Sequence, residues 1–160
     1  WLEADLKANQ KQWTIVGMHR PMVCLRDITT PVVTRQQLLD LFVDNGVDLV
    51  IQAHEHVYEH TYPVGKNDTV YKNASSRTED GTKYYVNPEG IMFVTCATGG
   101  SDGKAAVDGV DESFFETYAK GNKQSWGNFY IDGNKLSIGV YYYDSGVKSY
   151  SNNKFGIIKE

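Results

Sequence analysis

The residues best suited to chemistry are the histidines, because three of the four lie within seven residues of one another. His54 and His56 form a His-x-His pair directly after residues 47–52, an apolar run that predicts a buried strand. If the chain stays extended past this run, the two imidazoles point the same way. Imidazole is a common ligand of zinc, iron and related metals. The pair therefore predicts a metal site at the end of a strand.

His19 follows a second strand-like run, residues 13–18, and a helical pattern over about 34–45 separates the two runs. A helix between two strands predicts a parallel pair with a crossover connection. The carboxyl ends of parallel strands lie at one edge of a sheet, where open α/β sheets bind ligands. We therefore expect His19 to lie close to His54.

Local signals set the limits of the helices in this part of the chain. Thr34 and Gln37 match a capping box, which predicts that Thr34 is the N-cap, and Gly46 is placed as the C-terminal stop. Residues 1–11 also predict a helix, and residues 20–33, which contain two prolines, predict a loop.

The rest of the chain is rich in strand signals. Residues 57–63 and 91–97 predict strands, 64–90 predict a polar excursion or hairpin, and 98–103 predict a glycine-rich turn. Turn signals at Gly133-Asn134 and Ser145-Gly146 separate three further strand patterns, at 128–132, 135–143 and 154–159. The predicted fold class is therefore α/β in a mixed α+β arrangement that ends in an antiparallel meander.

Composition limits the classes of partner. The 160 residues are 41% hydrophobic and 22% charged, as expected of one soluble domain. A net charge of -4 without a cluster of Lys and Arg argues against nucleic acid and anionic membranes as partners. No apolar run is long enough to span a membrane. The chain opens at Trp1, without a signal-peptide pattern, so we expect it to be cut from a longer chain.

Cysteines and glycosylation motifs give weaker signals. Cys24 and Cys96 either form one long-range disulfide or are two buried thiols, and we favour the thiols. Asn67 and Asn73 each begin an acceptor sequon in polar, loop-like sequence, which hints at a secreted protein.

Both histidine motifs resemble those of the calcineurin-like metallophosphoesterases, and within that family those of the purple acid phosphatases. Residues 16–22, Val-Gly-Met-His-Arg-Pro-Met, resemble the Val-x-x-His motif with its Arg-Pro-Met continuation. Residues 53–59, Ala-His-Glu-His-Val-Tyr-Glu, resemble the Gly-His-x-His motif and the Tyr-Glu that follows it. The helix at 1–6, the strand and glycine turn at 94–100, and Trp126 with the end strands also fit. The resemblance thus covers nearly the whole chain.

This resemblance implies a sandwich of two mixed sheets flanked by helices, with a two-metal site. His19 and His54 would bind a divalent metal (zinc, manganese or iron), and His56 would bind iron. The Asp, Tyr and Asn ligands of the family belong to earlier motifs that this sequence lacks. Residues 1–160 would then be the C-terminal portion of a single catalytic domain, with the N-terminal half outside the chain and the chain alone inactive.

The implied activity is that of a metal-dependent phosphoric monoester hydrolase of the acid phosphatase type. A metal-bound hydroxide would attack phosphorus, so the chain itself needs no Ser or Cys nucleophile. Glu55 and Tyr58 are candidates for support of the metal ligands, with plain solvation as the alternative for Glu55. The family also implies a secreted, lysosomal or vacuolar location.

Two residues depart from the family's motifs. Ala53 stands where the family has Gly, and His60 stands where it often has Arg and is not predicted to be a ligand.

Two other functions remain as alternatives. A mononuclear zinc hydrolase that uses the same three histidines is one alternative. A non-catalytic, secreted domain derived from the phosphatase fold is another.

Two further stretches have structural explanations. We expect the acidic run 108–116 to be a solvated surface, and the rings of 141–143 to be packed and exposed in alternation.

Overall fold

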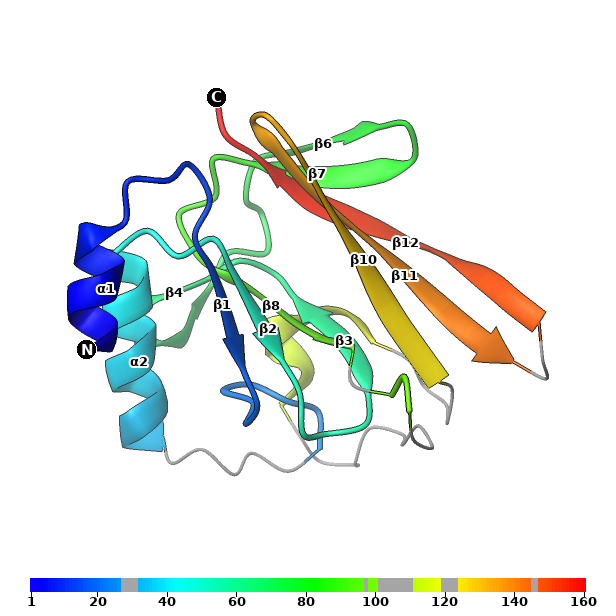
Figure 1. Ribbon diagram of the computed structural model, residues 1–160, viewed down its shortest axis with the longest axis horizontal. Coiled ribbons are helices and arrows are strands. Elements are labelled where there is room, and N and C mark those ends of the chain that lie inside the picture. The colour runs from blue at the N-terminus through cyan, green and yellow to red at the C-terminus, as the bar shows by residue number, and fades with distance from the viewer. Residues whose placement is uncertain (27–31, 97, 101–110, 119–123, 145–146) are drawn as a thin grey trace.

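Two five-stranded sheets face each other, and two helices cover the outer face of one of them (Figure 1). A computed structural model describes residues 1–26, 32–96, 98–100, 111–118, 124–144 and 147–160. The helices are α1 (Leu2–Ala8) and α2 (Val32–Asp44). The first sheet has the order β1-β2-β8-β3-β9, and the second has the order β10-β11-β12-β7-β6. The predicted mixed fold, with a two-sheet sandwich flanked by helices, is confirmed.

The strands of the first sheet are β1 (Ile15–Met18), β2 (Leu49–Gln52), β3 (Tyr58–Thr61), β8 (Met92–Cys96) and β9 (Phe115–Tyr118). Those of the second sheet are β6 (Ser76–Glu79), β7 (Thr82–Val86), β10 (Gln124–Asp132), β11 (Lys135–Asp144) and β12 (Val147–Ile158). A small antiparallel pair, β4 (Val64–Gly65) and β5 (Thr69–Val70), and the 3-10 helices η1 (Lys66–Asp68) and η2 (Glu112–Phe114) complete the elements. The parallel pairing of β1 with β2 and the antiparallel meander β10–β12 are confirmed. Strand β9 and the parallel pairing of β12 with β7 were not predicted.

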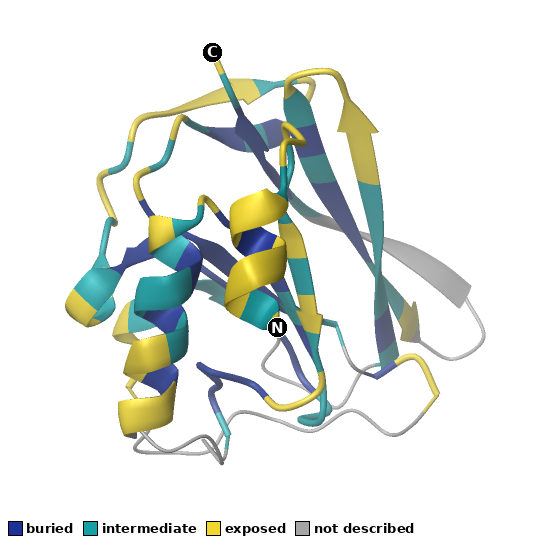
Figure 2. Ribbon diagram, turned by 60° about the vertical axis from the view of Figure 1, so that its left-hand side comes forward, coloured by how far each residue is buried: buried dark blue, intermediate teal, exposed yellow. Residues whose placement is uncertain are grey.

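The central strands are buried on both faces. Leu49 and Met92 contribute to an apolar layer between the two sheets, whereas their neighbours Val50 and Phe93 pack under the helices. Figure 2 shows this pattern, with the buried residues on the facing sides of the elements and the exposed residues on the outer helix surfaces. Burial on both faces explains why these strands read as continuous apolar runs.

The predicted end of α2 is confirmed. Gly46 has φ +66°, in the left-handed region. The N–H of Gly46 donates to the carbonyl of Val43, and the N–H of Val47 donates to the carbonyl of Phe42. These two bonds form a Schellman cap, which is the usual role of glycine at this position.

The predicted start of α2 is wrong. The helix begins at Val32, so Thr34 lies inside its first turn and is not the N-cap. In the sequence Pro31 directly precedes the helix, and proline favours a helix start because its fixed φ suits the first turn. Ala97, the Ser145-Gly146 turn and half of the predicted 98–103 turn lie outside the described residues.

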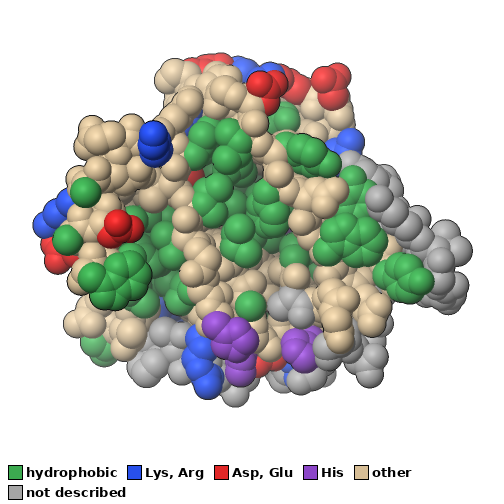
Figure 3. All heavy atoms as spheres, in the orientation of Figure 1, with side chains coloured by type: hydrophobic (Ala, Val, Ile, Leu, Met, Phe, Trp, Pro, Cys, Tyr) green, Lys and Arg blue, Asp and Glu red, His purple; other side chains and the backbone are tan. Residues whose placement is uncertain are grey.

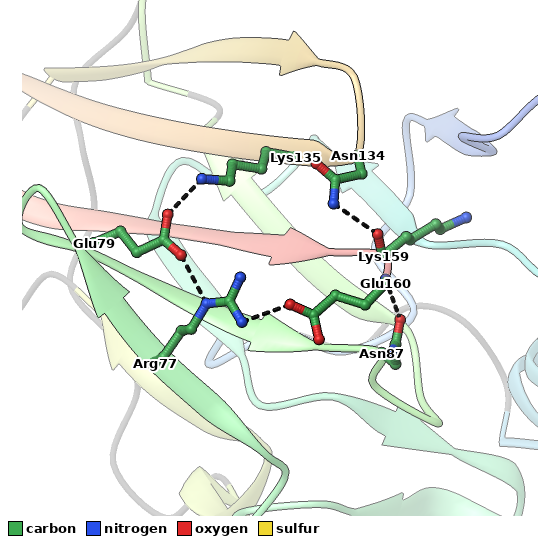
Figure 4. A network of polar contacts seen from close by, with 7 residues as sticks. All are labelled: Arg77, Glu79, Asn87, Asn134, Lys135, Lys159 and Glu160. Carbon is green, nitrogen blue, oxygen red and sulfur yellow. Dashed lines mark hydrogen bonds and ion pairs between the residues drawn. The ribbon is translucent and has the colours of Figure 1, made fainter.

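A surface network fixes the C-terminal end of β12 to its neighbours (Figure 4). Arg77 pairs with Glu79 and with Glu160, and Lys135 also pairs with Glu79. Two asparagine side chains bond the backbone of the last two residues. Exposed ion pairs of this kind contribute little free energy, so the network defines the path of the chain end more than it stabilises the fold.

Candidate metal centre

Two of the three predicted ligands converge at the carboxyl ends of β1 and β2. His19 directly follows β1, and His54 lies just beyond β2, its parallel neighbour. The Nε2 atom of His19 lies 3.1 Å from the Nδ1 atom of His54, and the ring planes cross at 77°. Histidine side chains gather along one rim of the molecule in Figure 3. The proximity predicted from the order of the strands is confirmed.

The backbone around the histidine pair is not extended, so that premise of the prediction is wrong. It makes two successive three-residue turns, in which the N–H of Glu55 bonds the carbonyl of Ala53 at 2.8 Å and the N–H of Val57 bonds the carbonyl of Glu55 at 2.9 Å. His54 is central in the first turn and has φ +67°. His56 is central in the second turn, half-buried, and outside the left-handed region.

The two turns replace the alternation that would have aimed both imidazoles the same way. In the ranges that the structure describes, no group of three or more His, Cys, Asp or Glu side chains is arranged to hold a metal ion. The convergent part of the site within these ranges is therefore the pair His19 and His54. Ala53 does not have a positive φ, so alanine replaces the family's glycine there without backbone strain.

An ion pair joins the loops that carry the two histidines. Arg26 donates through Nε to Oε2 of Glu55 at 3.0 Å, and the Glu55 side chain is only 12% exposed. Plain solvation of Glu55 is therefore wrong, because its carboxylate links the loop after β1 to the turn at His54.

The loop that follows β1 is buried, and two side chains of the sheet satisfy its backbone. The amide oxygen of Gln52 accepts from the N–H of Met22 at 2.7 Å and of Val23 at 3.3 Å, and its Nε2 donates to the Val23 carbonyl at 2.9 Å. Oε2 of Glu59 accepts from the N–H of Leu25 at 2.9 Å. Neither anchor was predicted. The signal in the sequence is slight. Gln52 is a polar residue at the end of an apolar strand, whereas Glu59 lies in a strand of mostly polar residues and has no such signal.

Burial shifts the pKa of three groups in and under this loop. Burial raises the pKa of Glu59 to about 7, although hydrogen bonds from Leu25 and Thr95 favour its ionised form. Burial also raises the pKa of Cys96 to about 12, and that of Cys24 higher still. Both cysteines are free, which confirms the thiol alternative. With such pKa values neither thiol is a nucleophile near neutral pH.

His60 lies apart from the other histidines, in the core between the sheets. Its ring stacks on Phe155 with centroids 3.8 Å apart, and its Nδ1 lies 2.8 Å from the hydroxyl of Tyr58. The Tyr58 hydroxyl thus contacts His60 in this core. The Nε2 atom of His60 lies 3.4 Å from Glu116, whose side chain is 15% exposed. The expectation that the acidic run 108–116 is solvated is therefore wrong for Glu116, because β9 carries it against the second sheet.

The two sequon asparagines are exposed. Asn67 lies in η1, and Asn73 lies on the rim of a cavity of about 650 Å³ beside the loop after β7. Their exposure is compatible with the predicted glycosylation.

Comparison with known proteins finds acid phosphatases among the relatives of this chain. No family model matches the sequence. The chain is 34% identical over 119 residues to acid phosphatase type 7 of Homo sapiens, a match that covers 64% of the chain and 26% of that protein. It is 30% identical over 97 residues to an acid phosphatase of Aspergillus ficuum, covering 59% of the chain and 16% of that protein.

The fold has a counterpart among solved structures. The purple acid phosphatase from seeds of yellow lupin (Lupinus luteus) superposes with a TM-score of 0.71 at 19% identity, over 99% of the chain and 28% of that protein. The chain is thus similar in sequence to acid phosphatases and in fold to a purple acid phosphatase, so the resemblance carried by the two histidine motifs is confirmed. The chain spans between 16% and 28% of the length of these relatives.

Proposed function

We propose that the chain is the C-terminal portion of a single metallophosphoesterase catalytic domain, and that the complete domain hydrolyses phosphoric monoesters as acid phosphatases do. The observation that carries this proposal is the convergence of His19 and His54 at the ends of two parallel strands. The similarity of this chain to acid phosphatases supports it.

The donor set fits metal ions. Paired imidazoles suit zinc, iron and manganese, and the ring nitrogens of His19 and His54 are close enough to share one hydrogen bond. These two residues would hold one ion, and His56 would contribute to the second, iron. When bound, the two ions supply Lewis-acid activation of the ester and of water. The residues of this chain would hold and orient the metal ions. The Asp, Tyr and Asn ligands would come from sequence N-terminal to residue 1.

The mononuclear zinc alternative has less support. A mononuclear site needs three convergent protein ligands, and the described part of the chain contains no such group.

The fold has a face suited to the N-terminal portion. Strands β1 and β10 are edge strands of the two sheets, and both lie toward the viewer in Figure 1. Ile15 on β1 and Tyr130 and Ile131 on β10 are exposed. Figure 3 shows apolar side chains gathered in the middle of this face. Unpaired edges beside apolar surface invite further strands, so we place the N-terminal half of the domain here.

The substrate class and the location of the protein follow from the same proposal. The substrate is a phosphate ester and not a nucleic acid, since the net charge is negative. Exposed sequons at Asn67 and Asn73 support a glycosylated protein, secreted or in a lysosome or vacuole. In the described ranges no helix is long and apolar enough to cross a membrane.

The test is hydrolysis of p-nitrophenyl phosphate at acidic pH by the complete protein and by its His54→Ala variant. We expect the variant to lose activity together with bound metal, while full activity would contradict the proposal. The gene upstream of Trp1 is a second test. The proposal requires Gly-Asp-x-x-Tyr and Gly-Asn-His motifs there, and their absence would favour the non-catalytic alternative.

A further inference from the structure

The segment Met22–Leu25 is a loop with the burial of a core strand. All four of its residues are buried. A buried loop must find partners for its backbone, since each unpaired N–H or carbonyl costs free energy. Three of its four N–H groups donate to only two side chains, Gln52 and Glu59. The position of the loop is therefore defined by two acceptors and not by a regular ladder.

The two acceptors belong to one row across the first sheet. Gln52 on β2 is in register with Thr95 on β8, and Thr95 is in register with Glu59 on β3. The row is bonded internally, because the Gln52 amide donates to the Thr95 hydroxyl at 3.3 Å and that hydroxyl donates to Glu59 at 3.1 Å. The row is also buried throughout. Such a network is rigid when every member has its partners.

The row lies between the two histidine-bearing segments. The loop that it holds starts three residues after His19. Gln52 is the last residue of β2, before His54, and Glu59 is the second residue of β3, after His56. Apolar packing of Met22 and Leu25 keeps the loop on the sheet but has no preferred direction. Hydrogen bonds are directional, so the two anchors decide where the loop sits along the sheet, and hence where His19 stands relative to His54.

We propose that Gln52 and Glu59 are positioning residues, which set the separation of His19 and His54 by holding the loop Met22–Leu25 to β2 and β3. This inference rests on the proposed function, because the separation matters only if the two imidazoles share a metal. Residues that orient metal ligands typically change metal affinity by about 10- to 100-fold when they are lost.

The test measures Co²⁺ binding to the metal-free complete protein, through the visible absorption of the bound ion and its dissociation constant. Glu59→Leu and Gln52→Leu each remove one anchor from a different strand. Glu59→Gln is the conservative variant, because its amide can still accept from Leu25 and can donate to Thr95.

Thr61→Val is the matched control. Thr61 lies two residues beyond Glu59 on the same strand and is fully buried, and its hydroxyl accepts from the N–H of Phe93 on β8 at 3.0 Å and not from the loop.

We expect both leucine variants to weaken Co²⁺ binding by about 10- to 100-fold, with Glu59→Gln restoring most of the affinity and Thr61→Val keeping that of the unmodified protein. If Glu59→Leu does not fold, the Co²⁺ affinities of Gln52→Leu and Glu59→Gln test the inference. Equal losses in the leucine variants and in Thr61→Val would overturn the inference, because a general loss of stability would then explain them.

Failure of the inference can be told from failure of the proposed function by including His54→Ala. If His54→Ala loses Co²⁺ binding while both leucine variants retain it, only the positioning role is overturned. If His54→Ala binds Co²⁺ as tightly as the unmodified protein, the metal centre itself is wrong and the positioning role falls with it.

Discussion

His54 combines a ligand type with an unusual backbone. Its φ of +67° lies in the left-handed region, which non-glycine residues rarely adopt. That conformation costs roughly 1–2 kcal/mol for an L residue. Strained residues persist where the surrounding structure holds them, and they cluster at functional sites. Here the conformation closes the turn from Ala53 to Glu55 and directs the imidazole of His54 toward His19.

A pair of substitutions tests this strain. His54→Gly and His54→Ala both remove the imidazole, but only glycine accepts the left-handed conformation at no steric cost. In urea unfolding of the metal-free complete protein, we expect the Gly variant to be more stable than the Ala variant by about 1 kcal/mol.

His56 provides the control for this comparison, because its φ is not positive. There the order should reverse, with His56→Gly less stable than His56→Ala, since glycine loses more backbone entropy on folding. The same order at both positions would contradict the assigned turn.

Residue positions could be predicted from the sequence only in part. The proximity of His19 and His54 follows from strand order, because the ends of parallel neighbours share one edge. The left-handed turn could not be predicted, since the sequence His-Glu-His has no glycine or asparagine to mark it. The anchors Gln52 and Glu59 were missed because their role depends on registers with β8, which is far along the chain.

At the scale of elements, a polar cluster joins three strands across the core. Glu116 on β9 accepts from the hydroxyl of Tyr85 at 2.9 Å and from the ammonium of Lys83, both on β7. It also lies 3.4 Å from Nε2 of His60 on β3. Burial by itself would raise the pKa of Glu116, but the hydrogen bonds from His60 and Lys83 outweigh it and lower the pKa to about 2.

This lowered pKa predicts a pH dependence of stability. The unfolded carboxyl group titrates near its ordinary pKa of 4.5, so the folded state gains stability from Glu116 above that pH. The gain is lost as the pH falls from 4.5 toward 2. Burial also lowers the pKa of His60. The unfolded chain therefore takes up that proton first, which likewise reduces stability as the pH falls.

The measurement is the free energy of unfolding of the complete protein and its Glu116→Gln variant across this acidic range. We expect the difference between the two to shrink as the pH falls, because the variant lacks the titrating carboxylate. A difference that stays constant with pH would show that Glu116 is not held ionised by its neighbours.

The helices and strands, like the residue positions, could be predicted from the sequence only in part. The unit β1, α2 and β2 could be predicted because its periodicity and glycine stop are local in the sequence. Strand β9 and the pairing of β12 with β7 could not be predicted, because they join segments far apart and leave no local pattern. The acidic residues around β9 even suggested the opposite, a solvated surface.

For the whole molecule, we expect the isolated chain to be incomplete. Two of its edge strands, β1 and β10, lie beside apolar surface, and such edges promote association. We expect the 160-residue chain alone to self-associate, and to become a defined complex when it is produced together with its N-terminal portion. Size-exclusion chromatography with light scattering measures this directly. A monodisperse monomer of 18.0 kDa would contradict the prediction.

The architecture of the sandwich was predictable mainly through the resemblance of the two histidine motifs. Composition alone indicates one soluble domain and says nothing of two facing sheets. The second sheet depends on the parallel pairing of β12 with β7. Tertiary packing, and not strand propensity, determines this pairing.

We propose that this chain contributes histidine ligands to a two-metal centre. The most direct test is elemental metal analysis of the natively purified complete protein, expressed per mole of this chain, with His54→Ala as the comparison. We expect about two metal ions per chain, one of them iron, and a loss of metal in the variant. One ion or none in the unmodified protein would contradict it, and the similarity to acid phosphatases would then describe the ancestry of the fold and not its activity.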